Sequence, residues 1–158
     1  MYTMKKLLPL LLSLIFLTGC IQLDAPKVTY IDSKVTKVTI EGAQVDFLFD
    51  VENKNPIPLE VSGYSYKIYI NGRQLLSENR KGFGIGSNEK KRISIPIFVR
   101  YDRVFDSVLG IAANILAGKM YFDYKVEGNL SAGSSGLTVT APIRASGRVK
   151  IPKEYLKI

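Results

Sequence analysis

The sequence predicts an all-β protein folded as an antiparallel sandwich, and three features of one central stretch carry this prediction. Residues 45–52 alternate between apolar and polar side chains, which is the period of a strand with one buried face. The prolines of residues 55–58 then stop the strand, because proline lacks a backbone N–H and restricts the residue before it. A second alternating run at residues 64–70 ends at Asn71-Gly72, a strong signal for a tight hairpin turn.

Further strands are expected on both sides of this stretch. Residues 27–40 have the composition of one or two strands, but their alternation is imperfect around residues 28–31, which leaves the register open. Residues 73–79 are expected to pair back as a short strand. Residues 91–101 alternate again, and Pro96 places that strand at a sheet edge or a bulge, because a central strand needs the missing N–H.

The end of the chain completes the strand count. Residues 120–130 and 137–152 predict two more strands around a hairpin loop at residues 131–136. The glycines within residues 82–86 alternate with Phe and Ile, which favours a crowded edge strand over a phosphate-binding loop, since no G-K-[ST] motif or helix follows. About seven short strands are typical of immunoglobulin-like and fibronectin type III-like sandwiches.

One segment has a helical period instead. Apolar residues recur every three or four positions within residues 103–117, which predicts a single amphipathic helix. Asp102 can cap its N-terminus, and Gly118 fits just beyond its C-terminus. We expect this helix to cover one end or face of the sandwich, because its polar side lacks the Lys and Arg enrichment of a membrane-surface helix.

The first 19 residues have the features of a secretion signal. Lys5 and Lys6 form a basic start, and residues 7–17 form an apolar run. This run is too short to cross a hydrocarbon core of about 30 Å, which needs roughly 20 residues. Residues 1–19 are therefore expected to be removed as a signal peptide.

The leader ends in a motif that resembles the lipobox of bacterial lipoproteins: Leu17, Thr18, Gly19 and Cys20. The small residues let a signal peptidase reach the bond before the cysteine, whose thiol accepts a diacylglyceryl group. The resemblance implies that residues 20–26 are a lipidated N-terminus and a tether. It also implies several acyl chains such as palmitate, which anchor firmly where one chain binds only marginally. Ile21 stands where an aspartate would resemble an inner-membrane retention signal, which favours the outer membrane, facing the periplasm, in a host with two membranes.

The proline-locked corner carries a second resemblance. Residues 53–59 are similar to the N-P-N-P-I-P-L signature of late embryogenesis abundant group 2 proteins, also called the water-stress and hypersensitive response (WHy) domain. The matching positions are Asn53, Asn55, Pro56, Ile57, Pro58 and Leu59. Lys54 departs from the signature, which usually has proline there. The resemblance implies that residues 27–158 form one sandwich domain with a role in tolerance of desiccation, freezing or related envelope stress.

The residue inventory excludes most catalytic chemistry. The chain has no His and one Cys, which removes most nucleophilic and zinc sites and any intramolecular disulfide. The best carboxylate cluster is Asp46, Asp50 and Glu52, but Asp46 and Asp50 are about 13 Å apart along a strand. That distance is too long for a shared metal ion or an acid/base pair. We expect instead an acidic stripe paired with Lys67 on the neighbouring strand, and no catalytic residue, metal or cofactor apart from the lipid on Cys20.

Composition and charge restrict the partners. The 158 residues are 46% hydrophobic and 23% charged, which is ordinary for one folded domain. The net charge of +8, which becomes +6 without Lys5 and Lys6, is compatible with an anionic partner. Nucleic acid is not expected, because the basic residues are spread over every segment and no recognition motif is present.

These features lead to the hypothesis of a non-catalytic, membrane-anchored lipoprotein of the bacterial envelope that contacts client proteins, lipids or the membrane. Two alternatives stay open. An apolar-ligand or lipid-binding and transfer module would have a continuous internal cavity, lined by Phe47, Phe49, Ile95 and Phe122. A structural subunit of an envelope complex would present a long unprotected strand edge or a large apolar patch.

Overall fold

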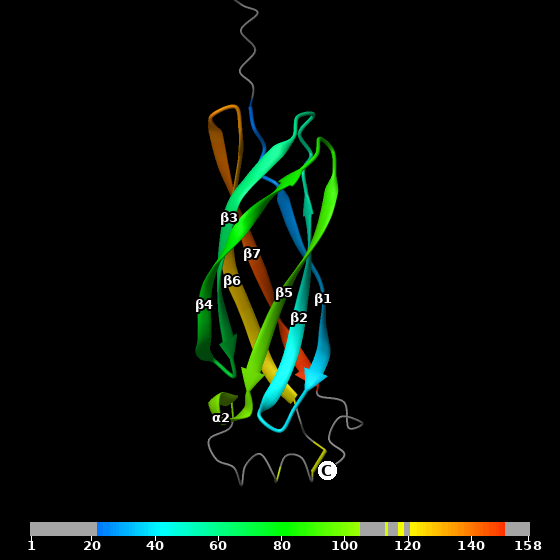
Figure 1. Cartoon of the computed structure of the whole chain (residues 1–158), viewed down its shortest axis with the longest axis vertical. Coiled ribbons are helices and arrows are strands. Elements are labelled where there is room, and N and C mark those ends of the chain that lie inside the picture. Colours follow the sequence, from blue (N-terminus) through cyan, green and yellow to red (C-terminus); the bar gives the residue numbers. More distant parts are fainter. Residues whose placement is uncertain (1–21, 105–112, 114–116, 119–120, 151–158) are drawn as a thin grey trace, which may run out of the picture.

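The computed structural model describes residues 22–104, 113, 117–118 and 121–150, and these form an elongated β-sandwich (Figure 1). This part of the chain contains seven strands and one short helix. In chain order they are β1 (Lys27–Val38), β2 (Gly42–Glu52), β3 (Leu59–Ile70), β4 (Arg73–Ile85), β5 (Lys90–Arg100), α2 (Tyr101–Val104), β6 (Tyr121–Ser134) and β7 (Leu137–Lys150).

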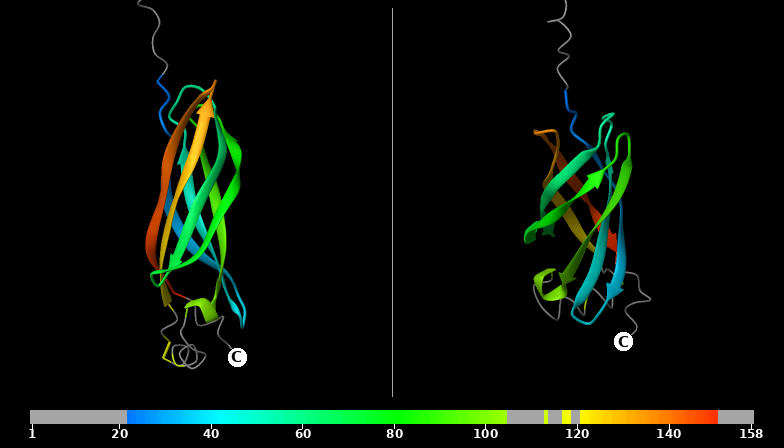
Figure 2. Two further views of the ribbon diagram at one scale, coloured as in Figure 1. Left: turned by 90° about the vertical axis from the view of Figure 1, so that its left-hand side faces the viewer. Right: turned by 45° about the horizontal axis from the view of Figure 1, so that its top comes forward.

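The strands form two layers, which Figure 2 shows from two further directions. One sheet has three strands in the order β1-β2-β5, and the other has four in the order β4-β3-β6-β7. Every neighbouring pair is antiparallel. The predicted all-β sandwich is therefore confirmed. The corner at residues 53–58 takes the chain from the first sheet to the second, so β2 and β3 are consecutive in sequence but not paired.

The alternation of β2 builds the core. Val45, Phe47, Phe49 and Val51 are completely buried, because β2 is the central strand of its sheet and its apolar face meets the other layer. The ring of Phe47 contacts that of Tyr124 in β6, with centroids 4.8 Å apart. Burial of such a side chain stabilises the fold by about 1.5–3 kcal/mol.

Bulges explain the segments whose alternation was imperfect. In β1 the register shifts between Tyr30 and Asp32 and again between Val35 and Lys37, so the strand changes face twice. The first shift leaves Ile31 exposed. Each bulge inserts one extra residue, so apolar side chains at both even-numbered and odd-numbered positions of β1 can face the core. A strand that alternates strictly would bury only one of these two sets.

One hairpin turn is as the sequence predicted, and the other is tighter. Asn71 and Gly72 both have positive φ, 47° and 80°, as expected for a two-residue turn. Ser135 and Gly136 repeat this geometry with φ of 50° and 83°. The expected six-residue loop at 131–136 is therefore wrong: β6 continues to Ser134, and only Ser135 and Gly136 form the turn.

The glycine-rich segment continues β4 rather than following it. β4 runs to Ile85, beyond the predicted end at residue 79, and is an edge strand. A Cβ on Gly82 would lie 1.5 Å from the carbonyl oxygen of Val61, so the crowding that the sequence predicted is present. Pro96 also lies in an edge strand, β5, as predicted.

Most of the predicted helix at residues 103–117 lies outside the described residues. Helix α2 begins at Tyr101, two residues earlier than predicted. Asp102 lies in its first turn and pairs with Arg100 at 2.8 Å, and so does not precede the helix as a cap. The amide of Ala117 donates to the carbonyl of Ala113 at 3.0 Å, and Gly118 has a φ of 64°, which fits a glycine just past a helical turn.

The sandwich has two distinct ends (Figure 1). We call the near end the one where residues 22–26 reach the sandwich; it contains the β2–β3 corner, the β4–β5 turn and the β6–β7 turn. The far end contains the β1–β2 turn and α2.

Candidate functional site

The signature residues form a corner at the near end, between β2 and β3. Asn53 and Asn55 are buried, with 0% and 4% of their surface exposed, whereas Lys54 between them is exposed. A buried amide costs free energy unless its donors and acceptor are bonded. The bonding of these two asparagines therefore decides what the signature does.

Asn53 ties three segments together. Its side-chain Nδ2 donates to the carbonyls of Ile57 and Gly86, both at 2.9 Å. Its Oδ1 accepts from the backbone N–H and the Nδ2 of Asn55, both at 2.9 Å. Its own amide donates to the carbonyl of Glu89 at 2.9 Å. Asn53 thus closes the corner on itself and fastens it to the β4–β5 turn.

Asn55 holds the segment that precedes β1. Its Oδ1 accepts from the amide of Asp24, and its Nδ2 donates to the carbonyl of the same residue, each at 2.9 Å. The side chain therefore pairs with Asp24 as a neighbouring strand would. Its carbonyl also accepts from the amide of Asn88 at 3.1 Å. We call this pairing of Asn55 with Asp24 the latch.

The remaining signature residues complete the corner. Leu59 is 1% exposed and begins β3 within the core, whereas Pro56 and Pro58 face solvent and Ile57 is half-buried. Lys54, which departs from the signature, has an exposed side chain. Since the backbone there is held from both sides by asparagines, the corner forms without the family's first proline.

The acidic stripe of β2 is paired within its own sheet. Asp50 accepts two hydrogen bonds from Arg92 of β5, at 2.7 and 3.1 Å, and these hold the pKa of Asp50 below its usual value. Asp46 accepts from Thr36 and Gln44, at 3.3 and 3.2 Å. The prediction that Lys67 pairs with this stripe is wrong.

The reason for this error is topological. Lys67 lies in the other sheet, opposite Ser77 and Glu127, because the proline corner carries β3 away from β2. Within the described part of the chain, no group of three or more Cys, Asp or Glu side chains is placed to hold a metal ion.

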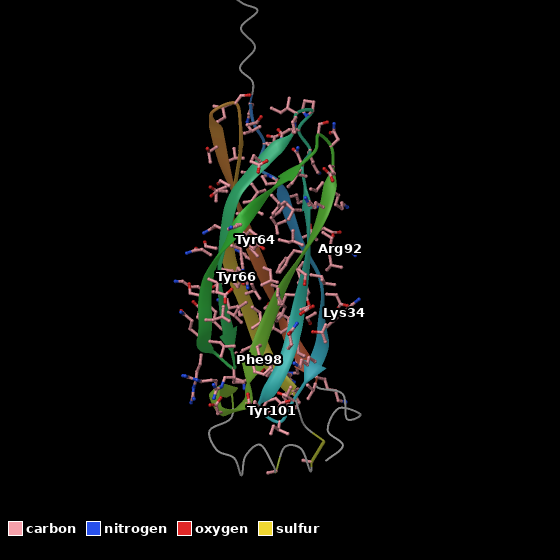
Figure 3. All side chains as sticks on the ribbon, in the orientation of Figure 1. Lys34, Tyr64, Tyr66, Arg92, Phe98 and Tyr101 are labelled. Atoms are coloured by element: carbon pink, nitrogen blue, oxygen red, sulfur yellow. The ribbon has the colours of Figure 1, made fainter. Side chains whose placement is uncertain are left out.

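The sequence did not predict a polar cluster on the edge strand β4. The buried Tyr66 donates to Glu78 at 2.8 Å and accepts from Arg80 at 3.1 Å, and Arg80 pairs with Glu78 at 2.7 Å. Burial raises the pKa of Tyr66 to about 12. Figure 3 shows Tyr66 beside Tyr64, on whose ring it stacks at 6.2 Å. The period of two in residues 76–80 was the available signal, since it puts Glu78 and Arg80 on the same face as Tyr66.

Tyrosines of β1 and β6 also link the two sheets. The hydroxyl of Tyr124 donates to that of Tyr30 at 2.7 Å, and burial raises the pKa of Tyr124. The Tyr30 ring packs edge-on against Phe49 with centroids 5.7 Å apart. The aromatic residues of these strands therefore hold the sandwich together.

The lipobox residues, Leu17, Thr18, Gly19 and Cys20, lie outside the described residues, so their role stays a prediction. The described tether ends at Gln22, two residues after Cys20. No helix in the described ranges is long and apolar enough to cross a membrane.

The fold and the corner define a class: a seven-stranded antiparallel sandwich whose β2–β3 corner is closed by buried asparagines. Residues 48–147 match the model of the LEA_2 family, described as late embryogenesis abundant protein. Because this match spans more than half of the chain, the protein belongs to the LEA_2 family.

Solved structures share the fold. At2g46140.1, a late embryogenesis abundant (LEA) protein by its name, matches with a TM-score of 0.62 and 17% identity, over 96% of this chain and 88% of its own. AT1g01470 from Arabidopsis thaliana matches with a TM-score of 0.55 and 18% identity, over 85% and 89%. A protein from Archaeoglobus fulgidus matches with a TM-score of 0.50 and 14% identity, over 83% and 98%. No curated protein sequence matches significantly.

Proposed function

We propose that this protein is a non-catalytic LEA_2 protein of the WHy type, anchored to the bacterial envelope by lipid on Cys20, that protects neighbouring proteins or membrane during water stress. The observation that carries the proposal is that the signature asparagines are bonded to the chain's own backbone and to each other. The signature asparagines are thus used to build the domain, which leaves the strand faces for contacts with neighbouring proteins.

Those faces carry interleaved charges. On the three-stranded sheet, Asp46 and Glu52 of β2 lie opposite Lys34 and Lys27 of β1, and Asp50 pairs with Arg92 of β5. Most of these charges are at least partly exposed, and pairs between exposed charges interact weakly and are screened by salt. Such a surface supports many weak contacts with other proteins as water is withdrawn, and needs no cofactor.

The packing argues against the apolar-ligand alternative. Phe47, Phe49, Ile95 and Phe122, which would line an internal cavity, are at most 2% exposed and belong to one hydrophobic core. The cluster of Tyr66, Glu78 and Arg80 argues against edge docking at β4, because charged residues pointing inward on an edge strand oppose added strands.

The protective function is tested with a labile reporter enzyme. The chain from Cys20 to Ile158 is expected to preserve reporter activity through drying or freeze–thaw in proportion to its concentration, without added cofactor. The control is an inert globular protein of equal mass and similar charge, since crowding alone stabilises by only about 0.2–1 kcal/mol. Protection no greater than that of the control would overturn this function.

The anchor is tested by Cys20→Ser. A hydroxyl does not accept the diacylglyceryl group, so the variant is expected to leave the membrane fraction or to stay unprocessed. Mass spectrometry of the protein taken from membranes is expected to find acyl chains on wild-type Cys20. A processed Cys20→Ser protein that still fractionates with membranes would show that the lipoprotein assignment is wrong.

A further inference from the structure

We infer that the near end of the sandwich is a membrane-contact surface, held against the lipid headgroups by the latch between Asn55 and Asp24. This inference rests on the proposed anchor at Cys20 and adds an orientation to it. The partner is the headgroup layer of the bilayer that carries the anchor.

The first argument is the length of the free tether. The latch fixes Asp24 to the corner by two hydrogen bonds of 2.9 Å. Only four residue steps then separate Asp24 from Cys20, and these span at most about 14 Å when fully extended. Without the latch the free segment would reach to Lys27 at the start of β1, about 24 Å. The latch therefore removes nearly half of the distance by which the domain could move away from the bilayer.

The second argument is the shape of the domain. The tether reaches the sandwich at one end of its long axis (Figure 1). A strand such as β6, with 14 residues, spans roughly 45 Å. A tether of about 14 Å keeps the near end close to the headgroup layer, which is only about 5–8 Å thick on each side of the hydrocarbon core. The far end lies several times further away.

The third argument is the composition of the near end. Pro56 and Pro58 are exposed, and Leu137 beside the β6–β7 turn is 48% exposed. The corner and this hairpin share a shallow groove of about 420 Å³, lined by Pro58, Leu59, Ile85, Gly86, Ser134 and Ser135. The exposed Glu60 is part of the groove lining, and the corner and the β4–β5 turn carry the exposed Lys54, Glu89 and Lys90. A mildly apolar end of mixed charge suits contact with headgroups, and the short tether, not net charge, holds it there.

The chain contains no Trp, so one introduced Trp reports on one place. The probes are Leu137→Trp at the near end and, as the matched control, Ile40→Trp at the far end, which is 97% exposed. Each variant of the chain from Cys20 to Ile158 is coupled through its only thiol, Cys20, to a maleimide lipid in phosphatidylcholine vesicles. Some lipids carry a nitroxide on the headgroup, which quenches nearby Trp fluorescence.

We expect at least about twofold stronger quenching of Leu137→Trp than of Ile40→Trp, with little dependence on salt. Inserting ten Gly and Ser residues between Ile21 and Gln22 leaves the fold untouched and is expected to bring the quenching of the near-end probe toward that of the far-end probe. Asn55→Ala is expected to act in the same direction.

Equal quenching of the two probes, or no effect of the insertion, would overturn the inference. Because the maleimide lipid supplies the attachment chemically, this outcome does not depend on whether cells acylate Cys20. Failure of the anchor itself would instead be seen by mass spectrometry of the protein isolated from membranes.

Discussion

The signature corner and the acidic stripe of β2 are both polar clusters that the sequence singled out, yet their buried members have different kinds of partner. The amides of Asn53 and Asn55 are buried and bonded to backbone groups of three segments. In the stripe, the Asp50 side chain is only 12% exposed, but it pairs with Arg92, whose side chain is 58% exposed, and Asp46 bonds to the exposed Thr36. Neutral amides can be buried at low cost when every bond is made, whereas a buried carboxylate such as Asp50 needs a charged partner, here Arg92, which reaches the surface.

This difference predicts a ranking of mutational effects. Removing a buried amide leaves backbone groups without partners, and each such group costs about 1–3 kcal/mol. Removing one member of an exposed ion pair changes stability by about 0–1 kcal/mol. Substitutions in the corner are therefore expected to lower the free energy of unfolding strongly. Substitutions in the stripe are expected to change mainly how that free energy depends on pH.

The largest effect is expected for Asn53→Ala. The carbonyl of Ile57 and the amide of Asn55 lose their partner, and the carbonyl of Gly86 keeps only the 3.3 Å bond from the amide of Glu89. The free energy of unfolding is therefore expected to fall by about 3–5 kcal/mol. Urea denaturation measures this change. Lys54→Ala is the matched control, since its exposed side chain predicts a change within about 0.5 kcal/mol. Similar midpoints for the two variants would contradict the structural role of the corner.

A smaller loss, about 2 kcal/mol, is expected for Asn55→Ala, which removes the latch but keeps the bonds from Asn53 to Ile57 and Gly86. Hydrogen exchange gives a residue-specific readout, because the amide of Asp24 is expected to exchange freely once its acceptor is gone. Continued protection of that amide in the variant would show that something other than Asn55 holds the tether.

The prolines are expected to contribute less than the amides. Pro56→Ala and Pro58→Ala each free a φ angle in the unfolded chain, at a cost of about 0.4–1 kcal/mol in the free energy of unfolding. In the double variant the free energy of unfolding is expected to fall by the sum of the two, about 0.8–2 kcal/mol, which lowers the urea midpoint. An unchanged midpoint would mean that the prolines serve contact rather than rigidity, and the membrane-contact test at the near end would then be repeated with them.

The smallest effect at neutral pH is expected for Asp50→Asn, and acid reveals its role. Arg92 lowers the pKa of Asp50 in the folded protein, so the stabilisation is present above the unfolded value of about 3.9 and is lost as pH falls through the lower folded value. Asp50→Asn is expected to weaken the acid dependence of the urea midpoint. Part of the acid dependence is expected to remain, because Asp102 and Asp123 are also paired with arginines that lower their pKa. If the urea midpoints of the wild type and of Asp50→Asn depend on pH in the same way, the Asp50–Arg92 pair does not contribute to stability.

Local patterns predicted much of this molecule, because each depends on neighbouring residues. The period of two identified β2, β3 and β5, and Asn71-Gly72 identified a hairpin. The turn at Ser135-Gly136 was predicted too wide, since serine residues are compatible with either a strand end or a loop. Polar residues on the exposed face of a strand do not show where the strand ends and the loop begins.

The sequence by itself determined the all-β class, the apolar face of β2 and the position of the corner, because alternation and proline geometry act within a few residues. Only the tertiary structure decided which strands pair. The corner sends β3 to the other sheet, so Asp50 finds Arg92, 42 residues away, and Lys67 lies opposite Glu127. The tertiary structure also decided which groups the signature residues bind, since Asn55 bonds to Asp24, 31 residues earlier in the chain. Pairings over such separations depend on how two layers pack around one core, and a local pattern does not contain that information.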